Sequence, residues 1–441
     1  MQPKIGFIVA GHRDYPNDVG INMARKAVEE LKKKNIEVIF FDQPQLDSIN
    51  ARKTAIRLIS EDVDGVVFFL GTWIEAPVAI AALREVEHLP IALWGFPMFK
   101  KNSRLDSTGS LVALFVLQGT LRRMGIPFKS IMGTTDDKKA ISQVISFSRA
   151  SCVKKALKRT RLGLVGYASM GMYPGTFDHA LLRKIIGPEV IHLDNYLLIN
   201  KTIKVSKIKM QDFISKLNEK ATVEGVPQEV LEKAARLYQA LKELIDGYQL
   251  NAVNLKCQYE LSQVYGCIPC VPMSLLSDEG IVCSCEGDVL TGITMVVLNY
   301  LSNQAIYYGD VLDFRNQDIL LSSCGFAPFS LANPRDKIKV REIGHPGFNG
   351  PICSFTLKRG KLTLARLNEK VGDYTFLFTC GEGMETELRQ GRFPALRIKL
   401  NTDVQEFLYS LESQHLAMCY GDWTQELFDL CHFLNIKANK L

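Results

Sequence analysis

The sequence has no apolar run long enough to span a membrane and no secretory signal. Its 441 residues begin with MQPKIGFIVAGH, whose short apolar run ends at the polar residues Gly11 to Asp14. A signal peptide needs a longer apolar region followed by a small-residue cleavage site, and a membrane helix needs about 20 apolar residues. The eleven cysteines are scattered and odd in number, which is not a disulfide framework. We therefore expect a cytoplasmic, soluble protein with reduced thiols and no membrane partner.

The chain also lacks a strong charge of one sign. Its 53 basic and 47 acidic residues give a net charge of +6, a mild excess that does not predict a nucleic-acid partner. Apolar residues make up 47% and charged residues 23%, which is ordinary for a globular enzyme and excludes disordered, collagen-like and coiled-coil proteins. At about 150 residues per domain, the length predicts two or three domains.

Several cofactor and catalytic motifs are missing. The glycines at 163–166 and 171–175 match neither the dinucleotide fingerprint nor the P-loop, and the Gly-x-Ser-x-Gly motif of serine hydrolases is absent. The pair Cys267 and Cys270 is a single CxxC, which is a weak zinc signal, and we interpret both thiols as structural. The sequence therefore supports no nicotinamide, nucleotide or serine-hydrolase chemistry.

What the sequence does contain is an alternation of strand and helix patterns. Continuous apolar runs at 5–10, 65–70 and 91–94 are typical of strands buried on both faces, and a helix is predicted over 21–34. This alternation predicts a doubly wound parallel sheet.

The alternation restarts later and then fades. It resumes at Leu162 after the basic stretch 154–161, which we interpret as an exposed helix end. After about residue 303, short β-rich pieces separated by Gly and Pro indicate a largely antiparallel region. The predicted fold class is α/β: two doubly wound α/β domains, 1–157 and 158–302, followed by a β-rich, mostly antiparallel C-terminal domain, 303–441.

Two carboxylates follow successive predicted strands that one helix joins. Glu286 comes after the apolar strand 280–285, and Asp310 comes after the strand 304–308. In a right-handed βαβ unit these strands can lie side by side, with both carboxylates at the edge of the sheet where ligands bind. Such a pair can bind a divalent cation or divide acid and base roles. Alternatively, Glu286 and Asp288 only favour a helix N-terminus and Asp310 caps a turn.

A histidine would complete a metal-binding set. His415 begins a short apolar strand, and a lone histidine is more often structural than a ligand. Together with Glu286 and Asp310, however, it would form an oxygen-plus-imidazole set that suits manganese.

The segment CEGDVLTGITMVVLNYLSNQAIYYGDV, residues 285–311, resembles the L-fucose isomerase family of the L-fucose/L-arabinose ketol-isomerase superfamily. The resemblance extends over essentially the whole chain, which is markedly shorter than the long bacterial fucose isomerases. It implies that Glu286 and Asp310 are both catalytic carboxylates and metal ligands, and that His415 is the third ligand. It also implies trimers or hexamers with active sites near subunit interfaces.

The same resemblance implies the residues that contact the sugar. Met170 lies in a Ser-Met-Gly that resembles the family's active-site loop. Trp73 is similar to a tryptophan that a neighbouring subunit contributes to the pocket, and Gln414 replaces the family's asparagine. The full implied set is Arg13, Trp73, Met170, Gln258, Ser323 and Gln414.

The implied function is a metal-dependent aldose–ketose isomerase of carbohydrate metabolism. A Mn²⁺ ion, or Mg²⁺ or Co²⁺, would stabilise the charge of an enediol intermediate while one carboxylate moves the carbon-bound proton. We expect Glu286 to be the principal base. The sugar stays open between L-fucose, D-arabinose, another pentose or deoxyhexose, and an anionic hexose derivative. The alternatives are a catalytically silent sugar-binding or regulatory protein on the same scaffold and a metal-free glycoside hydrolase.

Overall fold

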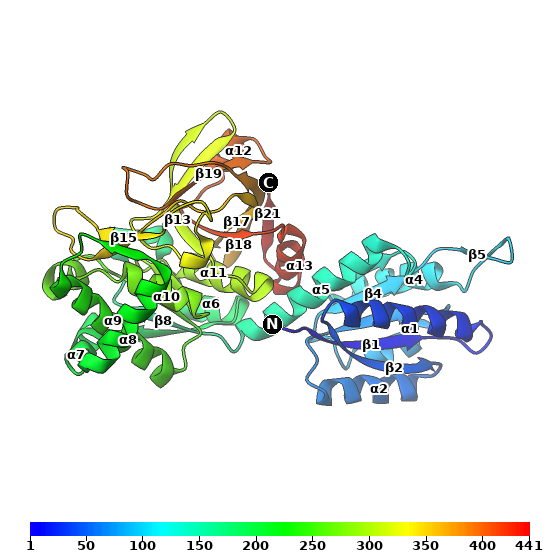
Figure 1. The fold of residues 1–441 in the computed structure, drawn as a ribbon. Helices are drawn as coiled ribbons and strands as arrows, with labels where there is room; N and C mark the ends of the chain where they lie inside the picture. Colours follow the sequence, from blue (N-terminus) through cyan, green and yellow to red (C-terminus); the bar gives the residue numbers. More distant parts are fainter. The chain divides into compact units, whose positions relative to one another are not determined.

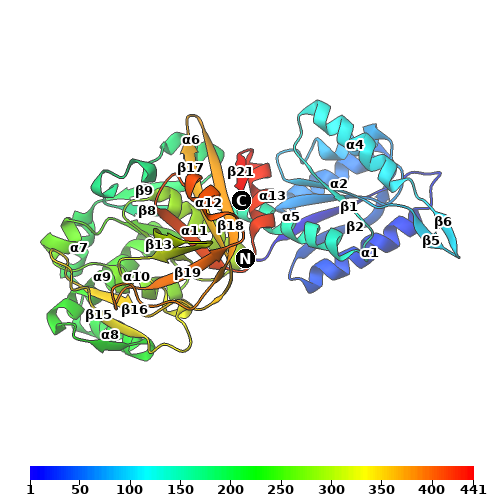
Figure 2. The same cartoon turned by 90° about the horizontal axis from the view of Figure 1, so that it is seen from above.

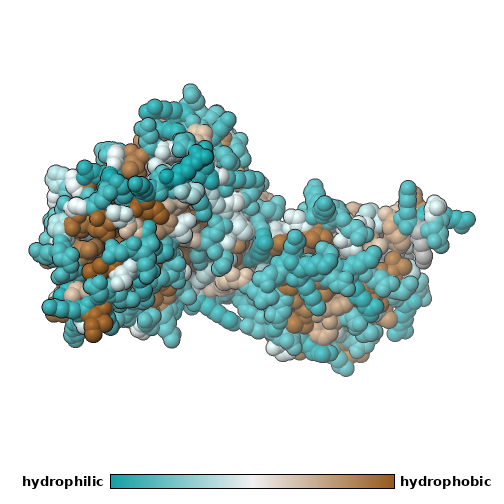
Figure 3. All heavy atoms as spheres, viewed as in Figure 1, coloured by the Kyte–Doolittle hydropathy of each residue, from teal (hydrophilic) through white to brown (hydrophobic). Residues whose placement is uncertain are grey.

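The computed structural model describes residues 1–441, except for the side chain of Lys101. The chain forms two compact units, residues 1–156 with 425–435 and residues 157–424 with 436–441. We describe each unit by itself, and the domain boundaries expected at 157/158 and 302/303 stay predictions. Hydrophilic residues predominate on the face drawn in Figure 3. Among the described residues, no helix is both long and apolar enough to cross a membrane.

The first unit is built on a five-stranded parallel sheet of order β2-β1-β3-β4-β7. The chain runs outward from β1 in both directions, so the strand order reverses between β1 and β3. Loops at the carboxyl ends of the two strands beside such a reversal form the usual ligand-binding crevice of an open α/β sheet. The strands are β1 (Lys4–Ala10), β2 (Glu37–Gln45), β3 (Gly65–Leu70), β4 (Ile91–Gly95) and β7 (Lys129–Met132).

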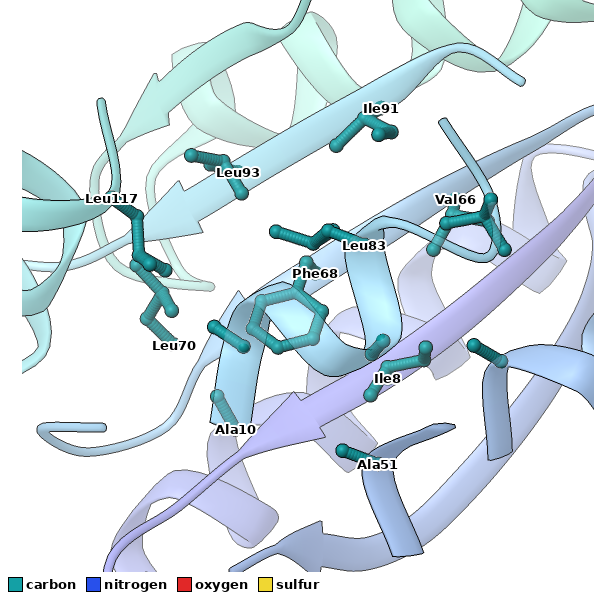
Figure 4. Packing of buried hydrophobic residues seen from close by; sticks show 14 of the residues in the cluster. Ile8, Ala10, Ala51, Val66, Phe68, Leu70, Leu83, Ile91, Leu93 and Leu117 are labelled. Carbon is teal, nitrogen blue, oxygen red and sulfur yellow. The ribbon is translucent and has the colours of Figure 1, made fainter. Parts of the chain in front are cut away.

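Helices cover both faces of this sheet because alternate strand residues point to opposite sides. Ile8, Phe68 and Leu93 pack with one set of helices (Figure 4), whereas Phe7 and Phe69 pack with the other set. The first set is α2 (Ser48–Ser60), α3 (Ala76–Leu83) and α4 (Ser110–Met124); the second is α1 (Asn17–Lys33), α5 (Lys138–Leu157) and α13 (Thr424–Leu434). The small hairpin of β5 (Phe99–Lys101) and β6 (Arg104–Asp106) extends away from the sheet in both ribbon views (Figures 1 and 2).

The second unit begins with a four-stranded parallel sheet of order β12-β11-β8-β9. Its strands are β8 (Arg161–Val165), β9 (Glu189–Leu193), β11 (Ala252–Leu255) and β12 (Val282–Cys285). The helices between these strands are α6 (His179–Ile185), α7 (Asn195–Ile203), α8 (Lys207–Lys220), α9 (Gln228–Tyr248) and α10 (Cys270–Asp278), and α11 (Val289–Ser302) follows β12. A small mixed sheet joins β10 (Thr222–Glu224) to β15 (Lys339–Glu342) and β16 (Pro351–Ser354).

The rest of the second unit is a mostly antiparallel sheet that closes on itself. Its order is β17-β20-β13-β14-β19-β18-β21, and β17 also pairs with β18, so six strands form a ring while β21 adds to β18 in parallel. The strands are β13 (Tyr307–Arg315), β14 (Asp318–Ser322), β17 (Gly360–Lys370), β18 (Asp373–Gly383), β19 (Ala395–Leu400), β20 (His415–Tyr420) and β21 (Lys437–Lys440), with α12 (Val404–Tyr409) before β20. The predicted fold class, two parallel α/β sheets followed by a β-rich antiparallel part, is confirmed.

One predicted pairing is wrong. The strand–helix–strand spacing predicts that the strands before Glu286 and before Asp310 can lie side by side in one parallel sheet. Instead β12 belongs to the parallel sheet, while β13 belongs to the closed antiparallel sheet and pairs with β14 and β20. Asp310 lies within β13 rather than beyond its end. After α11 the chain enters the antiparallel part that the sequence pattern predicts from about residue 303, whereas the strand–helix–strand spacing alone does not tell which sheet the second strand joins.

Candidate active site

Three side chains follow the carboxyl ends of neighbouring parallel strands. Met170 lies in the short helix η1 (Ser169–Gly171) after β8, Gln258 follows β11, and Glu286 directly follows β12. Because β8, β11 and β12 are adjacent in the sheet, their ends meet at one edge. The parallel sheet therefore supplies one side of the site.

The turn that carries Glu286 has an uncommon backbone. Glu286 has a φ of 64°, in the left-handed region that residues other than glycine rarely adopt, and Gly287 has a φ of 72°. The Glu286 N–H donates to the Leu255 carbonyl at 2.8 Å, and the Gly287 N–H donates to Asn254 Oδ1 at 2.8 Å. A Cβ on Gly287 would lie 2.4 Å from the Tyr167 carbonyl oxygen. Such strained residues cluster at functional sites because surrounding structure has to hold them.

The closed antiparallel sheet supplies the other side of the site. Asp310 on β13 is the register partner of His415 on β20, so their side chains lie on adjacent strands. His415 Nε2 is 3.3 Å from Asp310 Oδ1 and 3.2 Å from Glu286 Oε2. The three side chains predicted as metal ligands therefore converge at the junction of two sheets. Glu286 and Asp310 keep 13% and 27% of their side-chain surface exposed, so a ligand can reach both.

A buried carboxylate orients the histidine. His415 is 1% exposed and its Nδ1 donates to Asp288 Oδ2 at 2.8 Å, which leaves Nε2 facing Glu286 and Asp310. Asp288 is 2% exposed and also accepts from Thr291 N–H at 2.9 Å and from Arg366 Nη1 at 2.8 Å. Burial by itself would raise the pKa of Asp288, but Arg366 and His415 outweigh it and hold that pKa well below its ordinary value.

The surroundings of His415 favour a positive charge on its outer nitrogen. Burial lowers the pKa of His415, but the hydrogen bonds to Asp288, Asp310 and Glu286 outweigh it and raise the pKa well above the ordinary value. With two carboxylates facing Nε2, that nitrogen carries either a proton or a bound cation. A cation that binds there has to displace the proton.

The donor set fits a hard divalent ion. Two carboxylate oxygens and one imidazole nitrogen suit manganese or magnesium, and the carboxylate–histidine contact from Asp288 to His415 is the usual outer support of a metal-binding histidine. When an octahedral ion has bonds of about 2.1 Å, neighbouring ligand atoms lie about 3 Å apart. The distances from His415 Nε2 to Glu286 Oε2, 3.2 Å, and to Asp310 Oδ1, 3.3 Å, are close to that value. Among the described residues, however, no group of three or more His, Cys, Asp and Glu side chains is placed so that it could hold a metal ion as it stands, so the fit rests on the chemistry of the three donors.

Further polar side chains surround the three donors. Gln258 Nε2 donates to Glu286 Oε1 at 3.0 Å, and Ser169 Oγ donates to Gln258 Oε1 at 2.5 Å. Gln414 Nε2 lies 3.2 Å from His415 Nε2. These contacts fix the orientation of Glu286 and place an amide beside the imidazole.

A cavity of about 330 Å³ opens beside Glu286. This volume is at the lower end of the range for small-molecule sites and suits a monosaccharide. The lining residues include Met170, Gln258 and Glu286 from the predicted site, together with Cys257, Ile268, Cys270, Cys324, Ile343, His345, Phe348, Arg389, Gln390 and Phe393.

The remaining predicted residues, Ser323, Arg13 and Trp73, are not among those that line this cavity. The Ser323 hydroxyl donates to the Phe326 carbonyl at 2.6 Å, so its oxygen is engaged within its own loop. Arg13 and Trp73 belong to the first unit, where they follow β1 and β3 at the reversal of strand order. Their contact with a sugar stays a prediction.

Sequence reasoning treated Asp288 as a helix N-terminal residue and missed Arg366. Asp288 does cap α11, but it also orients His415. Arg366 is 0% exposed in the middle of β17. An arginine in an otherwise apolar alternating strand, LTLARL, was the available signal, because a buried arginine needs a carboxylate partner.

Comparisons with known proteins support a distant relationship along nearly the entire chain. No family model matches. The sulfoquinovose isomerase of Priestia aryabhattai is 23% identical over 447 residues, which covers 98% of this chain and 98% of that protein. That of Alkalicoccus urumqiensis is 23% identical over 385 residues, or 86% of each chain.

Among solved structures, an ABC transporter solute-binding protein from Burkholderia multivorans matches 69% of this chain and 95% of its own chain, at 14% identity. Its TM-score of 0.20 is too low to support an argument. The sequence relatives are therefore the informative result. The chain is a distant homologue of proteins named sulfoquinovose isomerase.

Proposed function

We propose that the protein is a metal-dependent aldose–ketose isomerase. The observation that carries this proposal is the convergence of Glu286, Asp310 and His415 Nε2, with Asp288 holding the far side of the imidazole. The distant relatives, which are named as isomerases of a sugar, support the same reaction class. A pure sugar-binding protein has no need for two accessible carboxylates and a histidine at one point.

The two carboxylates have separate tasks in this mechanism. Glu286, held through Oε1 by Gln258, removes the proton from C2 of the aldose and returns it to C1 of the enediol. Asp310 relays the proton that moves from O2 to O1, so the carbonyl passes from C1 to C2. His415 donates through Nδ1 to Asp288, so its Nε2 faces the centre of the site and would give up its proton to accept a bound cation.

Glu286, Asp310 and His415 would hold the ion, with Mn²⁺ as our first choice. When bound, it supplies a Lewis acid that stabilises negative charge developing on O1 and O2 of the sugar. The carboxylate that acts as the base has to be only loosely coordinated, because tight coordination lowers its basicity.

The substrate we propose to test first is sulfoquinovose, a glucose whose C6 hydroxyl is replaced by a sulfonate. It is the sugar in the names of the relatives. The neutral sugars L-fucose, D-arabinose and 6-deoxyglucose are the alternatives.

We also propose a homo-oligomer with active sites near subunit interfaces. Arg13 and Trp73 lie at the ligand-binding edge of the first sheet, after β1 and β3, where they could complete a site of a neighbouring subunit. Light scattering coupled to size exclusion tests the assembly, and a monomer at assay concentration with full activity would overturn it.

The experiment is proton NMR of this sugar panel in D₂O with metal-stripped protein, before and after Mn²⁺ is added. We expect metal-dependent ketose formation that the substitutions Glu286→Gln and Asp310→Asn abolish. The matched control is Glu260→Gln, because Glu260 pairs with Lys256 at 3.0 Å and does not line the cavity. Manganese binding without turnover of any sugar would favour the sugar-binding alternative, and turnover that needs no metal would contradict the proposed mechanism.

A further inference from the structure

The cavity beside Glu286 has one permanently charged basic side chain in its wall. The described residues that line it include a single Arg or Lys, Arg389, from the loop between β18 and β19. The same wall contains Gln390 and Phe393 from that loop, and His345 from the segment after β15. The cavity therefore has a carboxylate in one part of its lining and a guanidinium in another.

Arg389 is held in place by its neighbours. Its Nε donates to Ser322 Oγ at 2.9 Å, and its Nη2 donates to the Ser323 carbonyl at 3.0 Å. The guanidinium carbon also lies 4.3 Å from the centre of the Phe393 ring, a favourable cation–π distance. Ser322 is the register partner of Asp310, so Arg389 is anchored to the strand next to the one that carries Asp310.

The Arg389 guanidinium has N–H donors that its described hydrogen bonds do not use, and no described carboxylate pairs with it. Arginine has five N–H donors. Among the described residues three contacts are formed, the third from Nη1 to Gln390 Oε1 at 3.3 Å, so two donors remain for a ligand. None of the described carboxylates forms an ion pair with Arg389, whereas nearby Arg397 pairs with Asp313 at 2.9 Å. Charges in partly buried sites are usually paired, so a rigid, unpaired arginine in a cavity points to an anionic ligand.

We propose that Arg389 binds an anionic group on the sugar, at the end remote from C1 and C2. This inference rests on the proposed isomerase function, because Glu286 then defines where C1 and C2 lie. With Glu286 acting at C1 and C2, an anionic group bound by Arg389 also sets the direction in which the sugar enters the cavity. The ligand chemistry is a sulfonate, phosphate or carboxylate on C6, each of which matches the planar fork of arginine.

The experiment compares each anionic aldose with its neutral counterpart. The probes are sulfoquinovose, glucose 6-phosphate and glucuronate against 6-deoxyglucose and glucose, each assayed for kcat/KM with manganese-loaded wild type and variants. Arg389→Met keeps much of the aliphatic stem and removes the charged guanidinium that lies over Phe393. Arg389→Lys keeps the charge without the fork. The matched control is Arg392→Met in the same loop, because Arg392 donates to the Ile343 carbonyl at 3.2 Å and does not line the cavity.

We expect wild type to prefer one anionic sugar, and the anionic-to-neutral ratio of kcat/KM to fall at least about 30-fold in Arg389→Met, as expected for lost charge-assisted hydrogen bonds. Arg389→Lys should lose part of this ratio and Arg392→Met almost none. The anion that gives the highest ratio identifies the C6 group. Equal use of neutral and anionic sugars, or equal losses in Arg389→Met and Arg392→Met, would overturn the inference and leave the isomerase function standing.

Calorimetric binding of the methyl glycoside of sulfoquinovose, which cannot open to an aldehyde, separates the two proposals. Binding by wild type that Arg389→Met weakens at least about 30-fold, with no turnover of any aldose, would support the anion site and refute the isomerase function. A protein that neither prefers anionic sugars in turnover nor binds this glycoside would refute the anion site.

Discussion

The contact between Asp288 and Arg366 predicts a large effect of the substitution Asp288→Asn. The Asp288 Oδ2 atom accepts from Arg366, His415 and the Thr291 hydroxyl, while Oδ1 accepts the Thr291 N–H. An asparagine has one oxygen and one NH₂ group, so in either orientation its amide N–H groups face other donors. The helix cap, the imidazole or the guanidinium then loses its acceptor.

The magnitude follows from the burial of Arg366. Its side chain is 0% exposed, and removing one partner of a buried ion pair costs about 3–5 kcal/mol because the remaining charge is uncompensated. We therefore expect Asp288→Asn to lower the free energy of unfolding by at least about 3 kcal/mol. The double variant Asp288→Asn/Arg366→Met should lose about 2 kcal/mol less than the sum of the two single variants, because it no longer leaves a lone charge.

The assay is guanidinium denaturation followed by circular dichroism, together with manganese titration of the folded protein. The same substitution should weaken manganese binding about 10- to 100-fold, because His415 loses the partner that fixes its tautomer. The control is Glu385→Gln, which removes the exposed contact to Arg359 at 3.1 Å and should cost less than about 1 kcal/mol.

Three results would refute this reasoning. Asp288→Asn could be no less stable than Glu385→Gln, the two substitutions at 288 and 366 could be additive, or manganese affinity could be unchanged. The first two would mean that the ion pair contributes nothing beyond packing. The third would mean that His415 is not a ligand oriented by Asp288.

Three further predictions concern pH, the Glu286 turn and the thiols. Because the pKa of His415 is raised, its Nε2 is protonated below that raised value and free above it. Manganese affinity should therefore rise with pH, and manganese binding should release a proton, which calorimetry in buffers of different ionisation enthalpy measures. A manganese affinity that does not change between pH 5 and 8 would contradict this. Gly287→Ala should lower the free energy of unfolding by about 1–3 kcal/mol and reduce kcat, because the backbone φ at this position is 72° and the new Cβ would meet the Tyr167 carbonyl. An unchanged melting temperature and unchanged turnover would show that the turn is not constrained. Burial raises the pKa of Cys283 and Cys353 to about 12. Iodoacetamide at pH 8 should therefore modify these thiols only after unfolding, which mass spectrometry detects. Rapid labelling of the native protein would contradict their burial.

Several elements follow from local patterns that tertiary contacts did not override. The apolar run at 65–70 is β3, and the helix predicted over 21–34 is α1, which begins four residues earlier and ends one residue earlier. Both succeed because burial on two faces, or on one helical face, leaves a direct trace in the order of apolar residues.

The strands near Glu286 and Asp310 show what local sequence patterns do not determine. The spacing of strand, helix and strand is the same whether the second strand joins the first sheet or starts another, and here it starts another. The two carboxylates still converge, because β13 and β20 place Asp310 and His415 side by side facing the end of β12.

The sequence alone determined the fold class, the order of its parts and the residue types available for chemistry, since hydrophobic periodicity and composition are local properties. The tertiary structure decided which of those residues meet. The contacts of Asp288 and Arg366 with His415 join segments 49 to 127 positions apart, and Arg389 reaches Ser322 across 67 positions. Hydrogen bonds and ion pairs act over about 3 Å, so only the packing of the two sheets of the second unit brings these groups within that distance.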